Sequence, residues 1–210
     1  MTTGGTRGRL IALEGGEGAG KSTQAARLAA RLGAVLTREP GGTELGEAIR
    51  SLVLDPAGAV DVRTEVLLMA AARARHVVEV VEPALASGRH VVTDRFVDSS
   101  LAYQGYGRGI PLDEVRAVSA FATGGLEADL AVLLDVPAGQ AAARVAGVPD
   151  RFEAAGGEFH RRVVAGFHAL AAAEPGRWCV VDGTGSPEEV EDRVREAVAT
   201  RLGIGSRTLR

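Results

Sequence analysis

A glycine-rich octapeptide near the start of the chain constrains the fold more than any other stretch. Residues 15–22 read GGEGAGKS and fit the pattern G-x-x-x-x-G-K-[ST], with the apolar run LIAL before them and the helix-like STQAARLAARL after them. A strand, such a loop and a helix in this order predict a phosphate-binding loop, because the glycines let successive backbone N–H groups face an anion at the helix N-terminus. We therefore expect nucleotide contacts from Gly15, Gly16, Glu17, Gly18, Ala19, Gly20, Lys21, Ser22 and Thr23.

Lys21 is the only lysine of the chain, and every other strongly basic side chain is an arginine. A lysine ammonium is a compact charge on a thin stem, whereas a guanidinium is a broad planar fork. A tight loop around a phosphate has room only for the lysine. We expect Lys21 to reach the β- and γ-phosphates of the nucleotide and the Ser22 hydroxyl to bind Mg²⁺.

Short apolar runs recur along the chain and predict the sheet. They lie at residues 10–13, 34–37, 90–93, 130–136 and 178–182, with helical patterns between them. Continuous apolarity is typical of strands buried on both faces, as in a parallel sheet. The pattern predicts an α/β, three-layer fold with a five-stranded parallel sheet and helices on both faces, formed by one domain over residues 1–210. A last helix should begin at Pro187 with Ser186 as its N-cap, and residues 203–210 should be a frayed tail.

Charge and composition limit the classes of partner that the chain could bind. The formal net charge of −3 argues against a general nucleic-acid binder. There is neither a signal-peptide pattern nor an apolar stretch of about 18 residues, so we expect no membrane partner and a cytoplasmic location. The chain also lacks asparagine and a second lysine, which excludes the Asn-Lys-x-Asp motif with which GTPases usually read guanine. A compact kinase remains, whose second substrate is bound by arginines.

Three further segments follow the predicted strands, at the edge where open α/β sheets bind ligands. They read TREPGGTELGEAIR, TDRFVDSSLAYQGYGRG and ARVAGVPDRFE. With REPGGT, DR and SSLAYQGYGRGI among them, the chain resembles the thymidylate kinase family from Leu10 to about Leu202. The resemblance implies a P-loop kinase fold with a short lid at about 144–157, transfer from ATP and Mg²⁺ to dTMP giving dTDP, and a homodimer.

The resemblance also implies which residues hold the dTMP phosphate. Arg95 looks like the family arginine that forks onto this phosphate, and a bidentate guanidinium suits such a dianion. Arg38 and Arg50 resemble two further phosphate contacts, and Glu39 resembles the residue that shapes the pocket. Asp94 resembles the carboxylate that helps to place Mg²⁺ or the acceptor.

Base and sugar recognition is implied in the same way. Arg73 resembles the arginine that donates to thymine O4, and Met69, four residues earlier on one helix face, stands where relatives usually stack an aromatic ring. Tyr103 resembles the ring beneath the deoxyribose. The remaining polar side chains expected at the substrate are Ser99, Ser100 and Gln104, the last two around the N3 edge of the base.

The transferring phosphoryl group requires positive charge, and its source stays open in the sequence. Glu17 stands where the family has an acidic residue near this group, and Gly18 stands where one branch has an arginine. The other branch supplies the arginine from the lid, where Arg144 and Arg151 are both candidates. No side-chain nucleophile is required, so we expect direct in-line transfer. Alternatives are a related kinase that takes dUMP or another base, and a nucleotide-binding regulatory module without turnover.

Overall fold

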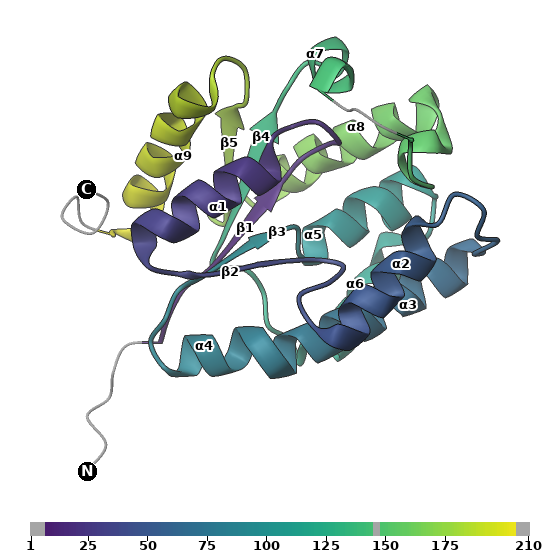
Figure 1. The fold of residues 1–210 in the computed structure, drawn as a ribbon, viewed down its shortest axis with the longest axis horizontal. Helices are drawn as coiled ribbons and strands as arrows, with labels where there is room; N and C mark the ends of the chain where they lie inside the picture. Colours follow the sequence, from purple (N-terminus) through teal and green to yellow (C-terminus); the bar gives the residue numbers. More distant parts are fainter. Residues whose placement is uncertain (1–6, 145–147, 205–210) are drawn as a thin grey trace.

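The structure is a computed structural model that describes residues 7–144 and 148–204. Its centre is a five-stranded sheet with the order β2-β3-β1-β4-β5 (Figure 1). All neighbouring strands are parallel. The strands are β1 (Leu10–Glu14), β2 (Val35–Arg38), β3 (Val91–Asp94), β4 (Leu130–Asp135) and β5 (Trp178–Asp182). The predicted α/β fold with a five-stranded parallel sheet is confirmed, and each strand lies on one of the five predicted apolar runs.

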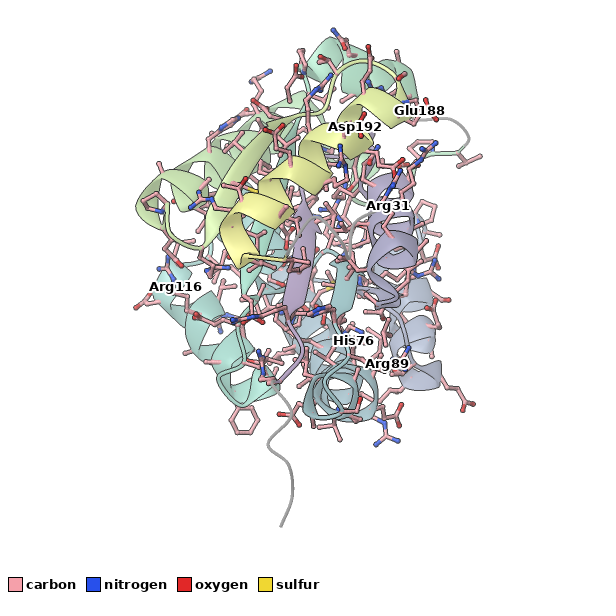
Figure 2. The ribbon with its side chains drawn as sticks, turned by 90° about the vertical axis from the view of Figure 1, so that its left-hand side faces the viewer. Arg31, His76, Arg89, Arg116, Glu188 and Asp192 are labelled. Carbon is pink, nitrogen blue, oxygen red and sulfur yellow. The ribbon has the colours of Figure 1, made fainter. Side chains whose placement is uncertain are left out.

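Two helices cover one face of the sheet. They are α1 (Lys21–Leu32) and α9 (Pro187–Leu202), which pack on alternate strand residues such as Ile11, Val132 and Val181. Ion pairs join the two helices, with Arg27 bound to Glu188 and Glu191 and Arg31 bound to Glu191. Figure 2 labels Arg31 on α1 and Glu188 and Asp192 on α9.

The other helices lie on the opposite face and toward one end of the sheet (Figure 1). One long helical stretch runs through α3 (Val62–His76), a π-helical segment (Val77–Val81) and α4 (Glu82–Ala86). A second runs through α5 (Val97–Ser100) into the π-helical segment η2 (Leu101–Gly107). The remaining elements are α2 (Glu44–Leu54), α6 (Leu112–Thr123), α7 (Ala138–Arg144), the short 3₁₀ helix η3 (Glu153–Ala155) and α8 (Gly157–Ala173). Helices therefore cover both faces, as the sequence predicts.

Local caps explain several helix starts. Ser186 and Glu189 form the predicted capping box at α9, with Pro187 in its first turn. Thr43 caps α2 and Asp61 caps α3 through their side-chain oxygens. Gly203 ends α9 in a left-handed conformation, and Ile204 packs against the core. Of the predicted tail and lid, residues 205–210 and 145–147 lie outside the described residues.

The parallel strands bring their carboxyl ends to one edge of the sheet. The loops after β1 and β3 meet there, since Leu13 is in register with Asp94 and Arg95 N–H donates to Leu13 O at 3.0 Å. Within residues 7–144 and 148–204, no helix is both long and apolar enough to cross a bilayer.

Candidate active site

The loop between β1 and α1 has the conformation that its glycines allow. Gly15, Gly18 and Gly20 have φ values of 141°, 72° and 89°, which L side chains rarely adopt. Gly20 is the left-handed N-cap of α1 and no side chain caps this helix, so the backbone N–H groups of its first turn remain available to an anion.

Lys21 lies inside this loop, 6% exposed, and its Nζ donates to Gly16 O at 2.7 Å. Burial and, after it, the charge of Arg95 lower the pKa of Lys21 to about 8, against the opposite effect of Glu17, Asp94 and Glu14. An anionic phosphate in the loop would oppose both effects and favour the charged ammonium.

Ser22 and Asp94 form the pair that the sequence assigned to Mg²⁺. The Ser22 hydroxyl donates to Asp94 Oδ2 at 2.5 Å. The other carboxylate oxygen, Asp94 Oδ1, is buried and has no hydrogen-bond partner among the residues that the structure describes. Two hard oxygen donors at the phosphate loop, one of them unpartnered, suit a magnesium ion that takes its other ligands from phosphates and water.

A cavity of about 420 Å³ opens over the loop. It is lined by all of the predicted residues from Glu17 to Thr23, and by Arg144, whose Nη1 donates to Gly183 O at 3.2 Å. The remaining wall, which the sequence analysis missed, consists of Gln24, Gly183, Gly185, Pro187 and Val190. Since most of it follows β5 directly, the rule that ligands bind beyond the carboxyl ends of strands would have found it.

Helix α7 lies against the loop between β1 and α1 (Figure 1). A Cβ atom on Gly18 would be 2.1 Å from the carbonyl oxygen of Ala141. The position where one branch of the family has an arginine therefore leaves no room for any side chain. The same helix ends at Arg144, so the packing that excludes a loop arginine also brings this arginine to the cavity over the loop.

Arg95 connects the phosphate loop to the loop after β3. Its Nη1 donates to Gly15 O and Ser99 Oγ, both at 3.0 Å. Its Nη2 donates to Glu17 Oε1 at 2.7 Å and to Tyr103 Oη at 2.9 Å, and the guanidinium lies 4.8 Å from the centre of the Tyr103 ring. Burial would raise the pKa of Glu17, but Arg95, Lys21 and the Tyr103 hydroxyl outweigh it and lower the value to about 2. Glu17 is thus an anion held on the guanidinium.

Glu14 supports Arg95 from behind, a role that the sequence analysis did not assign. Its Oε1 accepts from Phe96 N–H at 2.9 Å and its Oε2 from Ser99 Oγ at 2.5 Å. Arg95, which directly precedes Phe96, has a φ of 71°, the only positive value among the described non-glycine residues. Complete burial and the charge of Asp98 raise the pKa of Glu14 to about 8, although the two hydrogen bonds and Arg95 act in the opposite direction.

A second, smaller cavity of about 70 Å³ lies on the other side of Arg95. Seven of its lining residues belong to the predicted set: Glu17, Glu39, Arg50, Met69, Arg95, Ser99 and Tyr103. Pro40, Leu54, Asp150 and Phe152 complete the wall. Met69 also packs against the cluster of Ile49, Val53 and Ala72, so it contacts both the cavity and the local core.

Arg73 lies behind this cavity in a buried network. Its Nε donates to Glu39 Oε2 at 2.7 Å and its Nη2 to Ser100 Oγ at 3.0 Å. The other Glu39 oxygen binds His76 Nδ1 at 2.8 Å, and His76 Nε2 binds Thr37 Oγ1 at 2.7 Å. Figure 2 shows His76 inside the molecule. Arg73 and Ser100 are therefore next to the predicted site, but they are not among the residues that line its cavity.

The remaining predicted residues lie at different distances from the cavities. Arg38 is exposed and paired with Glu47 at 2.9 Å, and it lines neither cavity. Arg50 faces the smaller cavity and donates to Pro40 O at 3.0 Å. Gln104 is fully buried and donates to Glu65 Oε1 at 2.8 Å. Arg151 also binds Glu65, at 2.7 Å, and does not line the larger cavity.

The chain is similar to known proteins in sequence and in structure. A family model described as thymidylate kinase matches residues 13–194. A thymidylate kinase of Synechococcus sp. (strain JA-2-3B'a(2-13)) is 50% identical over 204 residues, covering 94% of this chain and 97% of that protein. One from Deinococcus radiodurans is 50% identical over 203 residues, covering 93% and 98%. The crystal structure of thymidylate kinase from Ehrlichia chaffeensis matches with a TM-score of 0.77 and 31% identity over 91% of this chain and 99% of that one.

Proposed function

The chain belongs to the thymidylate kinase family and phosphorylates dTMP to dTDP with ATP, and from this premise we propose that ATP binds in the larger cavity and dTMP in the smaller one. The observation that carries this placement is the junction between the cavities. Glu17 lines both cavities, and Arg95 lines the smaller one while its guanidinium binds Gly15 O and Glu17 of the phosphate loop. The transferring phosphate of ATP in the larger cavity and the phosphate of dTMP in the smaller one would therefore meet at Arg95.

Lys21 and Arg95 supply the charge for the transfer. The buried ammonium of Lys21 contacts the β- and γ-phosphates from the loop, and Arg95 holds the dTMP phosphate. This phosphate competes with the Glu17 carboxylate for the guanidinium, since one Glu17 oxygen accepts from Arg95 Nη2. No described side chain has to form a covalent intermediate, because phosphoryl transfer depends mainly on alignment and charge stabilisation.

Ser22 and Asp94 would hold a magnesium ion. Their oxygens lie at the phosphate loop, and the buried Asp94 Oδ1 lacks a partner within the described chain. The described residues contain no group of three or more His, Cys, Asp or Glu side chains suited to a metal. This donor set agrees with an ion held mainly by phosphates. When bound, Mg²⁺ neutralises charge that develops on the phosphoryl oxygens.

Arg144 is the lid arginine that we assign to the transferring phosphoryl group. It lines the nucleotide cavity at the end of α7, whereas Arg151 binds Glu65 and the backbone of Val53. The exclusion of any side chain at Gly18 by Ala141 O supports the assignment.

Recognition of dTMP is divided between the cavity wall and a layer behind it. Met69 and Tyr103 face the cavity and would contact base and deoxyribose. Arg73, Ser100 and Gln104 belong to the layer behind, where Arg73 positions Glu39 at the wall. Arg50 faces the cavity as a further phosphate contact, and Arg38 would have to leave Glu47 to join it.

A panel of acceptors tests the placement of the base. ADP release is measured with dTMP, dUMP, dCMP, dGMP and AMP, for the wild type and for Met69→Ala. We expect dTMP to be the best acceptor and Met69→Ala to raise KM for dTMP while KM for ATP stays unchanged. An acceptor preference that Met69→Ala does not alter would contradict the placement of the base beside Met69.

We also propose that the protein forms a homodimer in the cytoplasm. Several large apolar side chains are exposed, among them Leu67 of α3, Val78 of the adjacent π-helical segment and Phe121 of α6, which is 92% exposed. Such side chains suit a subunit interface. Light scattering of the wild type and of Phe121→Ser would test the dimer.

A further inference from the structure

Glu65 is a fully buried carboxylate that the proposed transfer does not use. It lies in the first turn of α3 and is 0% exposed. Its Oε1 accepts from Gln104 Nε2 at 2.8 Å, and its Oε2 pairs with Arg108 Nη2 at 3.2 Å and with Arg151 Nη1 at 2.7 Å. Side chains from α3, from the end of η2 and from the predicted lid therefore meet at one carboxylate.

The charges at this cluster make Glu65 indispensable to its geometry. Two guanidinium groups, of Arg108 and Arg151, face a single carboxylate, and their side chains are only 19% and 14% exposed. Without the carboxylate, two largely desolvated cations would face each other without a counter-charge. Within residues 7–144 and 148–204, Arg151 Nη2 and Gln104 Oε1 are already buried without partners, so loss of the carboxylate charge would add to the buried polar groups that are poorly satisfied in this cluster.

Arg151 connects Glu65 to the wall of the smaller cavity. Its Nε donates to Val53 O at 2.8 Å and its backbone N–H to Leu54 O at 3.2 Å. Its chain neighbours Asp150 and Phe152 both line the cavity.

The Phe152 ring is held from several sides. The guanidinium of Arg151 lies 4.8 Å from the ring centre and that of Arg108 lies 5.6 Å from it. The ring also packs edge-on against Tyr103, with ring centres 5.8 Å apart. Both arginines that bind Glu65 thus contact an aromatic wall of the cavity.

We propose that Glu65 is a positioning residue for the acceptor nucleotide. Through Arg151 and Arg108 it holds residues 150–152 in place as a wall of the smaller cavity, although it does not line that cavity itself. The inference rests on the proposed placement of dTMP in this cavity. It assigns Arg151 to the binding of the acceptor and not to the transferring phosphoryl group.

Steady-state kinetics of Glu65→Gln test the proposal. The amide has the same size but no charge, so it keeps the packing and loses both ion pairs. We expect KM for dTMP to rise about ten-fold, which corresponds to about 1.4 kcal/mol, while KM for ATP stays the same and kcat changes less than KM. Glu79→Gln is the matched control, since it removes the exposed pair between Arg75 and Glu79 and should change neither KM. A lower melting temperature with both KM values unchanged would show a merely structural role and overturn the proposal.

A double-mutant cycle of Glu65→Gln with Arg151→Gln tests whether Glu65 acts through Arg151. If Glu65 acts through Arg151, the double variant has nearly the same KM for dTMP as the Arg151 single variant. Independent, multiplicative effects would contradict this route. Arg151→Gln also replaces Glu65→Gln if the latter does not fold, and an unchanged KM for dTMP in this variant would then overturn the proposal.

Met69→Ala separates this inference from the proposed function. If Met69→Ala weakens dTMP binding but Glu65→Gln and Arg151→Gln do not, the cavity binds dTMP and Glu65 does not position its wall. If none of the three has an effect, dTMP binds elsewhere and both proposals fail.

Discussion

Lys21 shows how one side chain can determine what a loop binds. Lys21 is 6% exposed and its Nζ donates to Gly16 O at 2.7 Å, in a loop where Gly15, Gly18 and Gly20 have positive φ values. A guanidinium at this position would need space on two sides of the fork. The loop does not offer this space beside a phosphate.

We expect Lys21→Arg to lower kcat by about 10² to 10³, because loss of one positioned charge typically costs about 2.7 to 4 kcal/mol of barrier. The fold should persist, as judged by circular dichroism. Arg31→Lys, on the exposed side of the same helix, is the control for an exchange of Lys and Arg and should leave kcat unchanged. Near-wild-type turnover of Lys21→Arg would refute the account of the single lysine.

Met69 contacts both the smaller cavity, where it would affect the choice of substrate, and the local hydrophobic core. It lines the smaller cavity and packs on Ile49, Val53 and Ala72. A thioether contact with an aromatic face contributes about 0.3 to 1.5 kcal/mol, but the side chain must be ordered from several rotamers. Phenylalanine stacks with roughly 0.5 to 1.5 kcal/mol and has fewer torsions to freeze.

We therefore expect Met69→Phe to tighten dTMP binding a few-fold and Met69→Ala to weaken it by more, with ATP affinity unchanged in both. Calorimetric titration with dTMP measures the affinities. Leu68→Ala is the control, because Leu68 packs in the same cluster without lining the cavity. Equal dTMP affinity of the wild type and Met69→Ala would mean that Met69 serves only the core.

At the scale of elements, the two candidate arginines lie at different cavities. Arg144 ends α7 and lines the larger cavity, whereas Arg151, in the segment after it, lies between two residues that line the smaller cavity. We expect Arg144→Ala to lower kcat by about 10² with little change in KM for dTMP, since its contact forms mainly in the transition state. Arg151→Ala should instead raise KM for dTMP. Steady-state kinetics with both substrates varied distinguish the two results, and the assignment fails if Arg144→Ala retains full kcat.

Elements with a local signal could be predicted from the sequence. The five strands follow apolar runs, and α9 begins at the Ser186 capping box. The π-helical segments at Val77–Val81 and Leu101–Gly107 could not, because no residue pattern in these stretches distinguishes them from an α-helix. Across α5 and the second segment, Ser99 and Tyr103 face the cavity while Ser100 and Gln104 bond to side chains of α3. The spacing of four residues places each pair on one side but does not say which pair faces the ligand.

Other site residues could not be predicted from the sequence because their side-chain partners are distant in the chain. The sequence brings Arg144 and Arg151 to the same segment, but only the fold places Glu65 beside Arg151, at 2.7 Å. Glu14 is similar: in the sequence it directly follows an apolar run, whereas the register of β1 and β3 makes it the support of Arg95. Both carboxylates are invisible to motif analysis because their role depends on burial between elements.

At the scale of the whole molecule, the buried carboxyl of Glu14 links folding to pH. Its folded pKa is raised to about 8 by burial and by Asp98, above the value of 4.5 expected for an exposed glutamate. Between these two values the folded state keeps a proton that the unfolded state has released. The free energy of unfolding therefore decreases as pH rises from about 4.5 to 8, and the full cost of ionising Glu14 is reached above that range. Since one pKa unit corresponds to about 1.4 kcal/mol, the effect should amount to several kcal/mol.

Glu14→Gln should remove this slope, because an amide resembles the protonated carboxyl at every pH. We expect the variant to be about as stable as the wild type at pH 5.5 and more stable at pH 8.5, in urea unfolding followed by circular dichroism. Glu17→Gln is the matched control: the pKa of Glu17 is lowered to about 2, so this residue is ionised in both folded and unfolded states over that range. Its difference from the wild type should then stay constant with pH. Parallel curves for the wild type and Glu14→Gln would show that the carboxyl at the end of β1 is already ionised in the folded protein at pH 5.5, and that the support of Arg95 carries a negative charge throughout.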